Sequence, residues 1–147
     1  MRAVVHRVVE AQVSIEGRIV GEIGPGLLVF LGIHRNDSEL QAQKLSEKIL
    51  RLRIFDDSEG RMNLDLLATR GELLIVSQFT LYGDTAKGNR PSYSNAAPPA
   101  KALELYEFFI NYCRNRCTTV QTGQFQADMK VHLINDGPVT LLCDAES

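Results

Sequence analysis

The 147-residue chain is poor in several residue types that would point to a particular environment. It contains no tryptophan and only three cysteines, and an odd number of cysteines argues against a disulfide framework. No apolar run approaches the ~20 residues that a membrane-spanning helix needs, and residues 1–7 lack the apolar segment of a signal peptide. We therefore expect a protein of the reducing cytoplasm that makes no contact with a membrane.

A strong net charge is also missing. The formal net charge is −2, with 23% charged and 44% hydrophobic residues, which is typical of a soluble globular protein. The whole molecule is therefore not attracted to nucleic acid, and any such contact must come from a local basic patch. The length predicts one domain, spanning residues 1–147, that can bury a core without disulfides.

The signatures of familiar catalytic and cofactor sites do not occur. A serine triad has no support, because there is no Gly-x-Ser-x-Gly motif and the histidines are isolated from one another: His6, His34 and His132. The cysteines lie in apolar patterns, which favours core packing over a thiolate nucleophile: Cys113, Cys117 and Cys143. No glycine-rich phosphate loop or zinc signature is found, so we expect no metal and no cofactor. Main-chain amides remain as the groups that could do chemistry.

Apolar runs and alternating patterns predict strands over most of the chain. They cover residues 4–15, 18–23, 26–33, 73–80, 118–122, 127–134 and 139–143. Amphipathic patterns predict helices over about 39–53, capped by Asp37 or Ser38, and about 100–116, opened by a proline pair. The sequence therefore predicts an α+β fold that is rich in strands, with two main helices and sheets that close towards a barrel.

One charged residue, Arg7, interrupts the first predicted strand. The simpler interpretation puts its side chain in solvent, on the polar face of an alternating strand. The alternative is an anchor whose guanidinium group donates hydrogen bonds to backbone carbonyls.

Two polar stretches begin where apolar strand patterns end. Ser77-Gln78-Phe79-Thr80 follows the apolar run of residues 73–76, and Asn135-Asp136-Gly137-Pro138-Val139-Thr140 follows the pattern of residues 127–134. Between them, the long polar segment 83–97 carries Lys87 and Arg90, and loops of this length are usually functional or mobile. A Gly-Pro pair by itself most often only makes a turn.

Taken together, these stretches resemble the D-aminoacyl-tRNA deacylases. The resemblance is carried by Ser77-Gln78-Phe79-Thr80-Leu81-Tyr82-Gly83, Lys87-Gly88-Asn89-Arg90-Pro91-Ser92, Ala127-Asp128-Met129-Lys130-Val131 and Asn135-Asp136-Gly137-Pro138-Val139-Thr140. Their order and spacing match those of the family over essentially the whole chain. The first and last signatures are far more specific as a pair than either is alone.

The resemblance implies a hydrolase that cleaves the ester between a D-amino acid and tRNA, and that also removes glycine mischarged on tRNA(Ala). It implies a homodimer with the active site at the subunit interface. A cis Gly137-Pro138 bond of one subunit would enter the partner's pocket, where its carbonyls would reject an L side chain.

Residue roles follow from the same resemblance. Ser77 and Gln78 would order the pocket and hold the adenosine or the α-amino group, and Phe79 would either stack on the substrate or fill the core. Phe125 and Met129 would line the adenine side of the pocket, and Arg7 would fix the loop of residues 135–140 by hydrogen bonds. Lys87 and Arg90 would contact the tRNA phosphates. For Met129, core packing is the rival interpretation.

Two catalytic routes are compatible with the resemblance. Thr80 could be a nucleophile that forms a covalent intermediate. We favour a route in which the terminal ribose 2′-hydroxyl of the tRNA activates water while amides near Phe79 and Thr80 bind the oxyanion, because the sequence offers Thr80 no evident base. Two other functions stay open: a non-catalytic tRNA-binding module of the same fold, and a conventional small-ester hydrolase, which the lack of a histidine partner disfavours.

Overall fold

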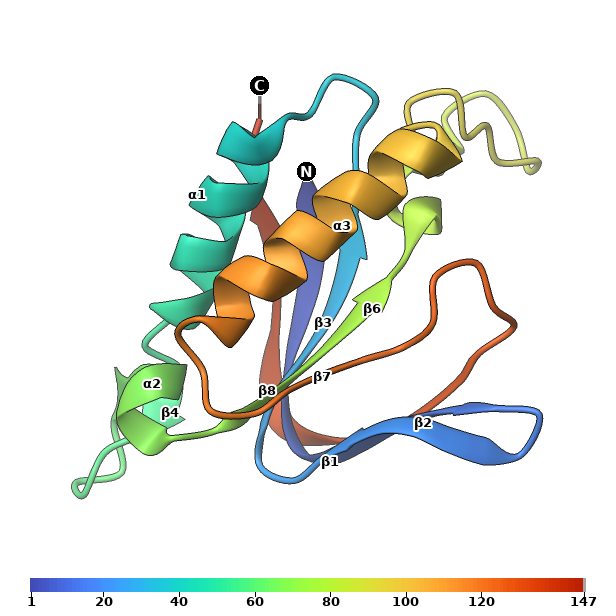
Figure 1. Cartoon of the computed structure of the whole chain (residues 1–147). Helices are drawn as coiled ribbons and strands as arrows, with labels where there is room; N and C mark the ends of the chain where they lie inside the picture. The colour runs from blue at the N-terminus through green and yellow to red at the C-terminus, as the bar shows by residue number, and fades with distance from the viewer. Residues whose placement is uncertain (147) are drawn as a thin grey trace.

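The computed structural model describes residues 1–146 and is built around one mixed sheet (Figure 1). The strand order is β2-β1-β3-β6-β7, with β8 paired to the other edge of β1. The strands are β1 (Arg2–Ile15), β2 (Arg18–Ile23), β3 (Gly26–Gly32), β6 (Glu72–Ser77), β7 (Val120–Thr122) and β8 (Lys130–Asp144). The strands β3, β6 and β7 are parallel, whereas β1 is antiparallel to each of its partners.

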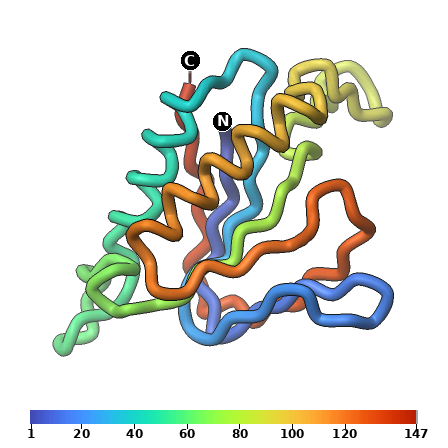
Figure 2. Tube along the Cα trace, viewed as in Figure 1, coloured from blue at the N-terminus to red at the C-terminus, as the bar shows by residue number. Residues whose placement is uncertain are grey.

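The length of β1 makes the sheet curl. The first half of β1 lies between β3 and β8, and its second half lies between β2 and β8. The register with β8 shifts between His6 and Val8 and again between Val8 and Glu10, and such irregularities bend a strand and increase its twist. Figure 2 shows the resulting sheet curling towards a barrel, which confirms the predicted α+β class.

Two long helices cover one face of the sheet (Figure 1). They are α1 (Glu39–Leu50), which begins with a capping box formed by Ser38 and Gln41, and α3 (Pro99–Arg114), which begins with a proline. Their apolar sides form the larger core together with residues of β1, β3 and β6. The core includes Val5, Leu27, Val29, Ile75, Leu45, Ile49, Leu105 and Phe109. No helix within residues 1–146 is long and apolar enough to cross a membrane.

A second, smaller core fills the curl of the sheet. It consists of apolar residues from the opposite face of the sheet and from the bent ends of β1 and β8: Val8, Ala11, Val13, Ile23, Leu28, Leu74 and Val76, with Phe30, Met129, Val131 and Leu133 packed against them. The run at residues 73–76 is therefore buried on both faces, which explains why its sequence is continuously apolar.

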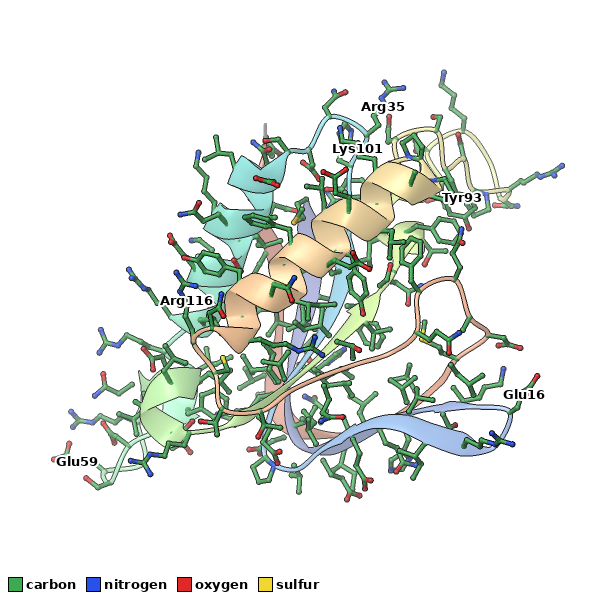
Figure 3. All side chains as sticks on the ribbon, in the orientation of Figure 1. Glu16, Arg35, Glu59, Tyr93, Lys101 and Arg116 are labelled. Carbon is green, nitrogen blue, oxygen red and sulfur yellow. The ribbon has the colours of Figure 1, made fainter. Side chains whose placement is uncertain are left out.

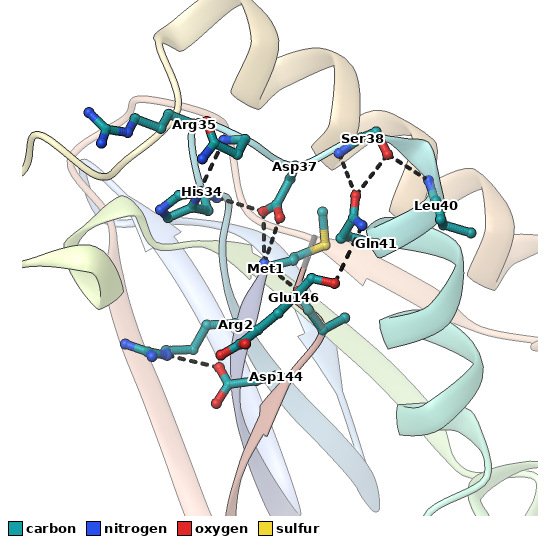
Figure 4. A network of polar contacts seen from close by, with 12 residues as sticks. Met1, Arg2, His34, Arg35, Asp37, Ser38, Leu40, Gln41, Asp144 and Glu146 are labelled. Atoms are coloured by element: carbon teal, nitrogen blue, oxygen red, sulfur yellow. Dashed lines mark hydrogen bonds and ion pairs between the residues drawn. The ribbon is translucent and has the colours of Figure 1, made fainter.

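The two ends of the described chain meet beside α1. The ammonium group of Met1 is buried and lies 2.8 Å from the carboxylate of Asp37, and it also donates to the carbonyl of Ala145 at 2.8 Å (Figure 4). Next to this pair, Arg2 donates to Asp144 at 2.9 Å near the surface. The ion pair with Asp37 compensates the buried ammonium group of Met1 for its loss of hydration.

Several predicted boundaries are wrong, and three short elements were not predicted. The predicted strands 127–134 and 139–143 are one strand, β8, because β1 pairs with both parts across an irregular turn. The predicted strand 73–80 ends at Ser77 and continues as a 3₁₀ helix, η1 (Phe79–Tyr82). A small hairpin, β4 (Phe55–Asp56) with β5 (Met62–Leu64), and a one-turn helix, α2 (Leu66–Thr69), were not predicted, since such short elements carry no periodic signal.

Candidate functional site

A pocket of about 800 Å³ opens at the end of β6. Its wall combines the end of β3 and β6, the segment that leads into α3, and the connection between β7 and β8. Among the lining residues are five that the sequence singled out: Ser77, Gln78, Phe79, Phe125 and Met129. The structure therefore brings together side chains that lie about 50 residues apart in the sequence.

The end of β6 leaves two main-chain amides without an acceptor in the part of the chain that the structure describes, residues 1–146. The amide of Gln78 still donates to the carbonyl of Leu31 at 2.8 Å, and the amide of Leu81 donates back to the carbonyl of Gln78 at 3.2 Å. The amides of Phe79 and Thr80 lie between these two and open η1, where a helix has no earlier turn to supply acceptors. Two adjacent donors are thus presented next to Ser77 and Gln78.

The hydroxyl of Thr80 has a neutral environment. Its hydrogen-bond partner within residues 1–146 is the side-chain amide of Gln78, which donates to it. Neither a histidine nor a carboxylate contacts this hydroxyl in that part of the chain, and Thr80 does not line the pocket. A nucleophilic role would require a base to take its proton.

Two exposed aromatic rings stand at the mouth of the pocket. Phe79 is 55% exposed and Tyr93 is 41% exposed, and their ring centroids lie 5.1 Å apart with an edge-to-face angle of 67°. Gly83 makes this approach feasible, because a Cβ at that position would lie only 3.0 Å from Cε1 of Tyr93. Lys87 and Arg90 lie further along the same loop, exposed to solvent and outside the pocket wall.

The opposite wall is formed by Phe125 and Met129. Phe125 packs on Tyr106 with 6.0 Å between centroids, and Met129 also packs against the smaller core. The hydroxyl of Tyr106 donates to the carbonyl of Ile75 at 2.8 Å, and burial raises the pKa of Tyr106 to about 12. Tyr106 therefore stays neutral and supports the end of β6 rather than acting as an acid or a base.

The second predicted stretch, residues 135–140, forms an irregular turn within β8. The Gly137-Pro138 peptide bond is cis. Arg7 is only 8% exposed and donates to the carbonyl of Asp136 at 3.2 Å and to that of Ile54 at 2.7 Å. The solvent-facing interpretation of Arg7 is therefore wrong, since its guanidinium group holds main-chain carbonyls.

Asn135 is a residue whose part in this turn the sequence interpretation missed. Its side-chain amide donates to the carbonyl of Arg7 at 2.9 Å and to that of Val139 at 3.1 Å, which closes the turn from within. Asparagine commonly bonds to nearby backbone in turns, and its position directly before Asp136 and Gly137 was the available signal.

Within one chain the two stretches do not form a common site. Gly137 and Pro138 are exposed, and neither lines the pocket that contains Ser77 and Gln78. Their turn is instead fixed beside Arg7, Ile54 and the carboxylate of Asp56.

The cysteines are unsuited to nucleophilic chemistry. Burial raises the pKa of Cys113 to about 12, with a smaller contribution from Cys117, and burial raises the pKa of Cys117 to about 11. Both are therefore protonated near neutral pH. Within residues 1–146, no cluster of three or more histidine, cysteine or acidic residues is arranged to hold a metal ion.

These observations define an α+β protein with a pocket at the end of β6 whose wall includes Ser77, Gln78 and Asp128 beside apolar and aromatic side chains. The profile of the D-Tyr-tRNA(Tyr) deacylase family matches residues 4–144, and the chain belongs to this family. It is 58% identical to the D-aminoacyl-tRNA deacylase of Thermosipho africanus (strain TCF52B), over 99% of this chain and 98% of that one.

Several solved structures share the fold. The c-Myc DNA Unwinding Element Binding Protein superposes with a TM-score of 0.95 and 37% identity over 100% of both chains. A probable eukaryotic D-amino acid tRNA deacylase superposes with a TM-score of 0.82 over 98% of both chains, at 17% identity, which supports the fold alone.

Proposed function

We propose that this chain hydrolyses the ester bond of D-aminoacyl-tRNA and releases the free D-amino acid and the tRNA. The observation that carries the proposal is the pocket at the end of β6, which Ser77, Gln78 and Phe79 line and beside which the amides of Phe79 and Thr80 have no acceptor within residues 1–146. The names of the close bacterial relatives agree with this activity. An aminoacyl ester is already an activated bond, so a site without a titratable nucleophile can suffice.

The amides of Phe79 and Thr80 bind the oxyanion that forms when water attacks the ester. A donor of this kind typically contributes about 2.7–4 kcal/mol to the transition state. The ribose 2′-hydroxyl of the substrate assists the water, because Thr80 has no base beside it. Ser77 and Gln78 order the pocket around the adenosine and the α-amino group, and Phe125 and Met129 contact the adenine.

Chiral selection is assigned to the carbonyls of Gly137 and Pro138. An apolar pocket distinguishes one methylene group by only about 1–3 kcal/mol, whereas a fixed wall that collides with one enantiomer can reject it more strongly. Arg7 and Asn135 fix this wall by four hydrogen bonds to main-chain carbonyls. A filter that acts on the side chain cannot exclude glycine, so glycine mischarged on tRNA(Ala) is a second substrate.

The wall reaches a pocket only if two chains associate, so the active unit is a homodimer with its sites at the interface. A surface for association is available on the outer face of β8 and β1. Leu142 is 74% exposed there and pairs with Val4, which pairs in turn with the half-buried Phe30. We assign the interface to this face because its own chain leaves the apolar side chain of Leu142 largely uncovered.

Lys87 and Arg90 contact phosphates of the tRNA, and the enzyme works in the cytoplasm, where its substrate is found. Replacing both residues with alanine should flatten the dependence of tRNA affinity on salt concentration. An unchanged slope would remove this pair from the contact surface.

The decisive experiment compares D-tyrosyl-tRNA with L-tyrosyl-tRNA. We expect free D-tyrosine to be released and the L ester to be spared. A tRNA-binding module without activity would bind both esters and cleave neither, and a general esterase would cleave both. Either result would refute the proposal.

A further inference from the structure

We propose that Arg35, Lys101 and Tyr93 form a contact surface for the unpaired nucleotides that precede the esterified end of the tRNA. This inference rests on the proposed function and extends it from the terminal adenosine to the preceding part of the strand. It adds Arg35 and Lys101, which lie outside both signature stretches, to the substrate-binding residues.

The three side chains lie at the same end of the molecule (Figure 3) although they come from different elements. Arg35 belongs to the connection between β3 and α1, Tyr93 to the long loop of residues 83–97, and Lys101 to the first turn of α3. Nζ of Lys101 donates to the carbonyl of Arg35 at 2.6 Å. The amide of Arg35 donates to the carbonyl of Asn95 at 2.9 Å. Figure 3 shows all three side chains at the end of the molecule where α3 begins.

Both positive charges are available to a ligand. No carboxylate lies within 4.0 Å of Arg35 or Lys101 in the described chain, residues 1–146. Most of the close cation–carboxylate contacts there involve residues that do not line the pocket. The side chain of Arg35 makes one long contact, at 3.5 Å, with the carbonyl of Ser94, and Figure 4 shows it extending away from the Met1–Asp37 pair. A phosphate could therefore bind without breaking an ion pair.

The surface begins where a strand would leave the pocket. Tyr93 lines the pocket, and so do Pro98, Pro99 and Ala102, which flank Lys101 on α3. The opposite wall carries Asp128, whose carboxylate would repel a polyanion even though Lys130 lies 3.0 Å from it. A strand whose last nucleotide fills the pocket is thus directed over Tyr93 towards Arg35 and Lys101.

Single-stranded RNA fits this combination of groups. Proteins that hold unpaired strands use exposed aromatic rings, on which bases stack, together with cations along the backbone. Tyr93 packs against Phe79 at an interplanar angle of 67° and lies close to Gly83, so the ring is oriented before a base arrives. The end of a tRNA is unpaired, which leaves its bases free to stack.

The test compares two esters of the same D-amino acid, one on full-length tRNA and one on adenosine alone. For the double variant Arg35→Ala/Lys101→Ala we expect KM for the tRNA ester to rise about tenfold. The slope of log affinity against log salt should fall by about 1.4, or about 0.7 for each lost contact to a single strand. The adenosine ester is too short to reach either residue, and its kcat/KM should keep the wild-type value.

Lys44→Ala/Arg61→Ala is the matched control, because it also removes one lysine and one arginine. Lys44 is on α1 and Arg61 is in the hairpin turn before β5, and neither residue lines the pocket. It should leave KM for both esters unchanged. At Tyr93, phenylalanine should preserve KM for the tRNA ester and leucine should raise it, since only the ring stacks.

The inference is overturned if the Arg35/Lys101 variant has the wild-type KM for the tRNA ester, or if both esters lose activity equally, which would indicate damage to the pocket itself. The proposed function fails in a different way. In that case the wild-type protein cleaves neither ester, whatever the variants do.

Discussion

The pocket at the end of β6 and the turn at residues 135–140 are built in opposite ways. The pocket is bordered by exposed aromatic rings, and the amides of Phe79 and Thr80 beside it have no acceptor within residues 1–146. The turn is clamped, because Arg7 and Asn135 occupy the carbonyls on both sides of Gly137-Pro138. A site that must accept a substrate keeps its donors free, whereas a wall that must reject one is held in place.

Breaking the clamp should produce the largest effect. Arg7→Ala removes two hydrogen bonds to main-chain carbonyls, one of them to the buried Ile54. We expect the free energy of unfolding to fall by about 2–3 kcal/mol, because each buried carbonyl left without a donor is costly. Hydrolysis of the L ester should rise as the turn loosens. Urea denaturation and an assay with both enantiomers measure the two effects.

Arg2→Ala is the control for this prediction, since it removes the same side chain from the same strand. Arg2 pairs with Asp144 near the surface, where both side chains are almost half exposed, so the loss should be under about 1 kcal/mol. Equal losses for the two variants would mean that Arg7 is not a clamp.

Phe79→Ala should give the opposite pattern at the pocket. The ring is exposed, so its removal should cost less than about 1 kcal/mol of stability. KM for the aminoacyl-tRNA should nevertheless rise about tenfold, because a stacking surface is lost. Ile19→Ala removes a similarly exposed side chain (53%) on β2 and should change neither quantity. If Phe79→Ala leaves KM unaltered, the ring of Phe79 only packs against its neighbours and does not bind the substrate.

These two regions also show how far the sequence could be interpreted. The strands, both long helices and the polar end at Ser77 carried local signals, namely periodicity, caps and an abrupt change from apolar to polar residues. The burial of Arg7 carried none, because a charge in a strand looks the same whether it faces water or carbonyls. The meeting of Phe125 and Met129 with Ser77 was expected only from the family resemblance, because it depends on the pairing of β6 with β7 and of β1 with β8, which local patterns do not reveal.

Thr80→Ala should have a smaller effect on the pocket. The hydroxyl accepts a hydrogen bond from Gln78 and contacts no base, whereas the amide of Thr80 is kept in the variant. We expect the single-turnover rate of the D ester to fall by less than about threefold, far below the ~10²–10³ that loss of an oxyanion donor costs. Near-total loss of activity would instead favour a covalent route through Thr80.

The smallest effect concerns His6, which contacts the last residue of the turn. Its Nδ1 is 2.9 Å from the hydroxyl of Thr140, and its ring packs against that of Phe30 at an interplanar angle of 87°. Burial lowers the pKa of His6 below its ordinary value of 6.5, so the folded chain binds fewer protons than the unfolded chain when the pH is between those two values. The contribution of His6 to the free energy of unfolding should therefore be fully present above pH 6.5. It should be lost as the pH falls from 6.5 towards the lowered pKa of the folded state.

His6→Gln should make the free energy of unfolding less dependent on pH between about 5 and 7, where an unperturbed histidine titrates. If the Gly137-Pro138 turn and the outer face of β8 meet a second chain, burial around His6 increases further, and dimer dissociation should follow the same pH dependence. If wild type and His6→Gln have identical pH profiles, His6 causes neither the pH dependence of unfolding nor that of dimer dissociation.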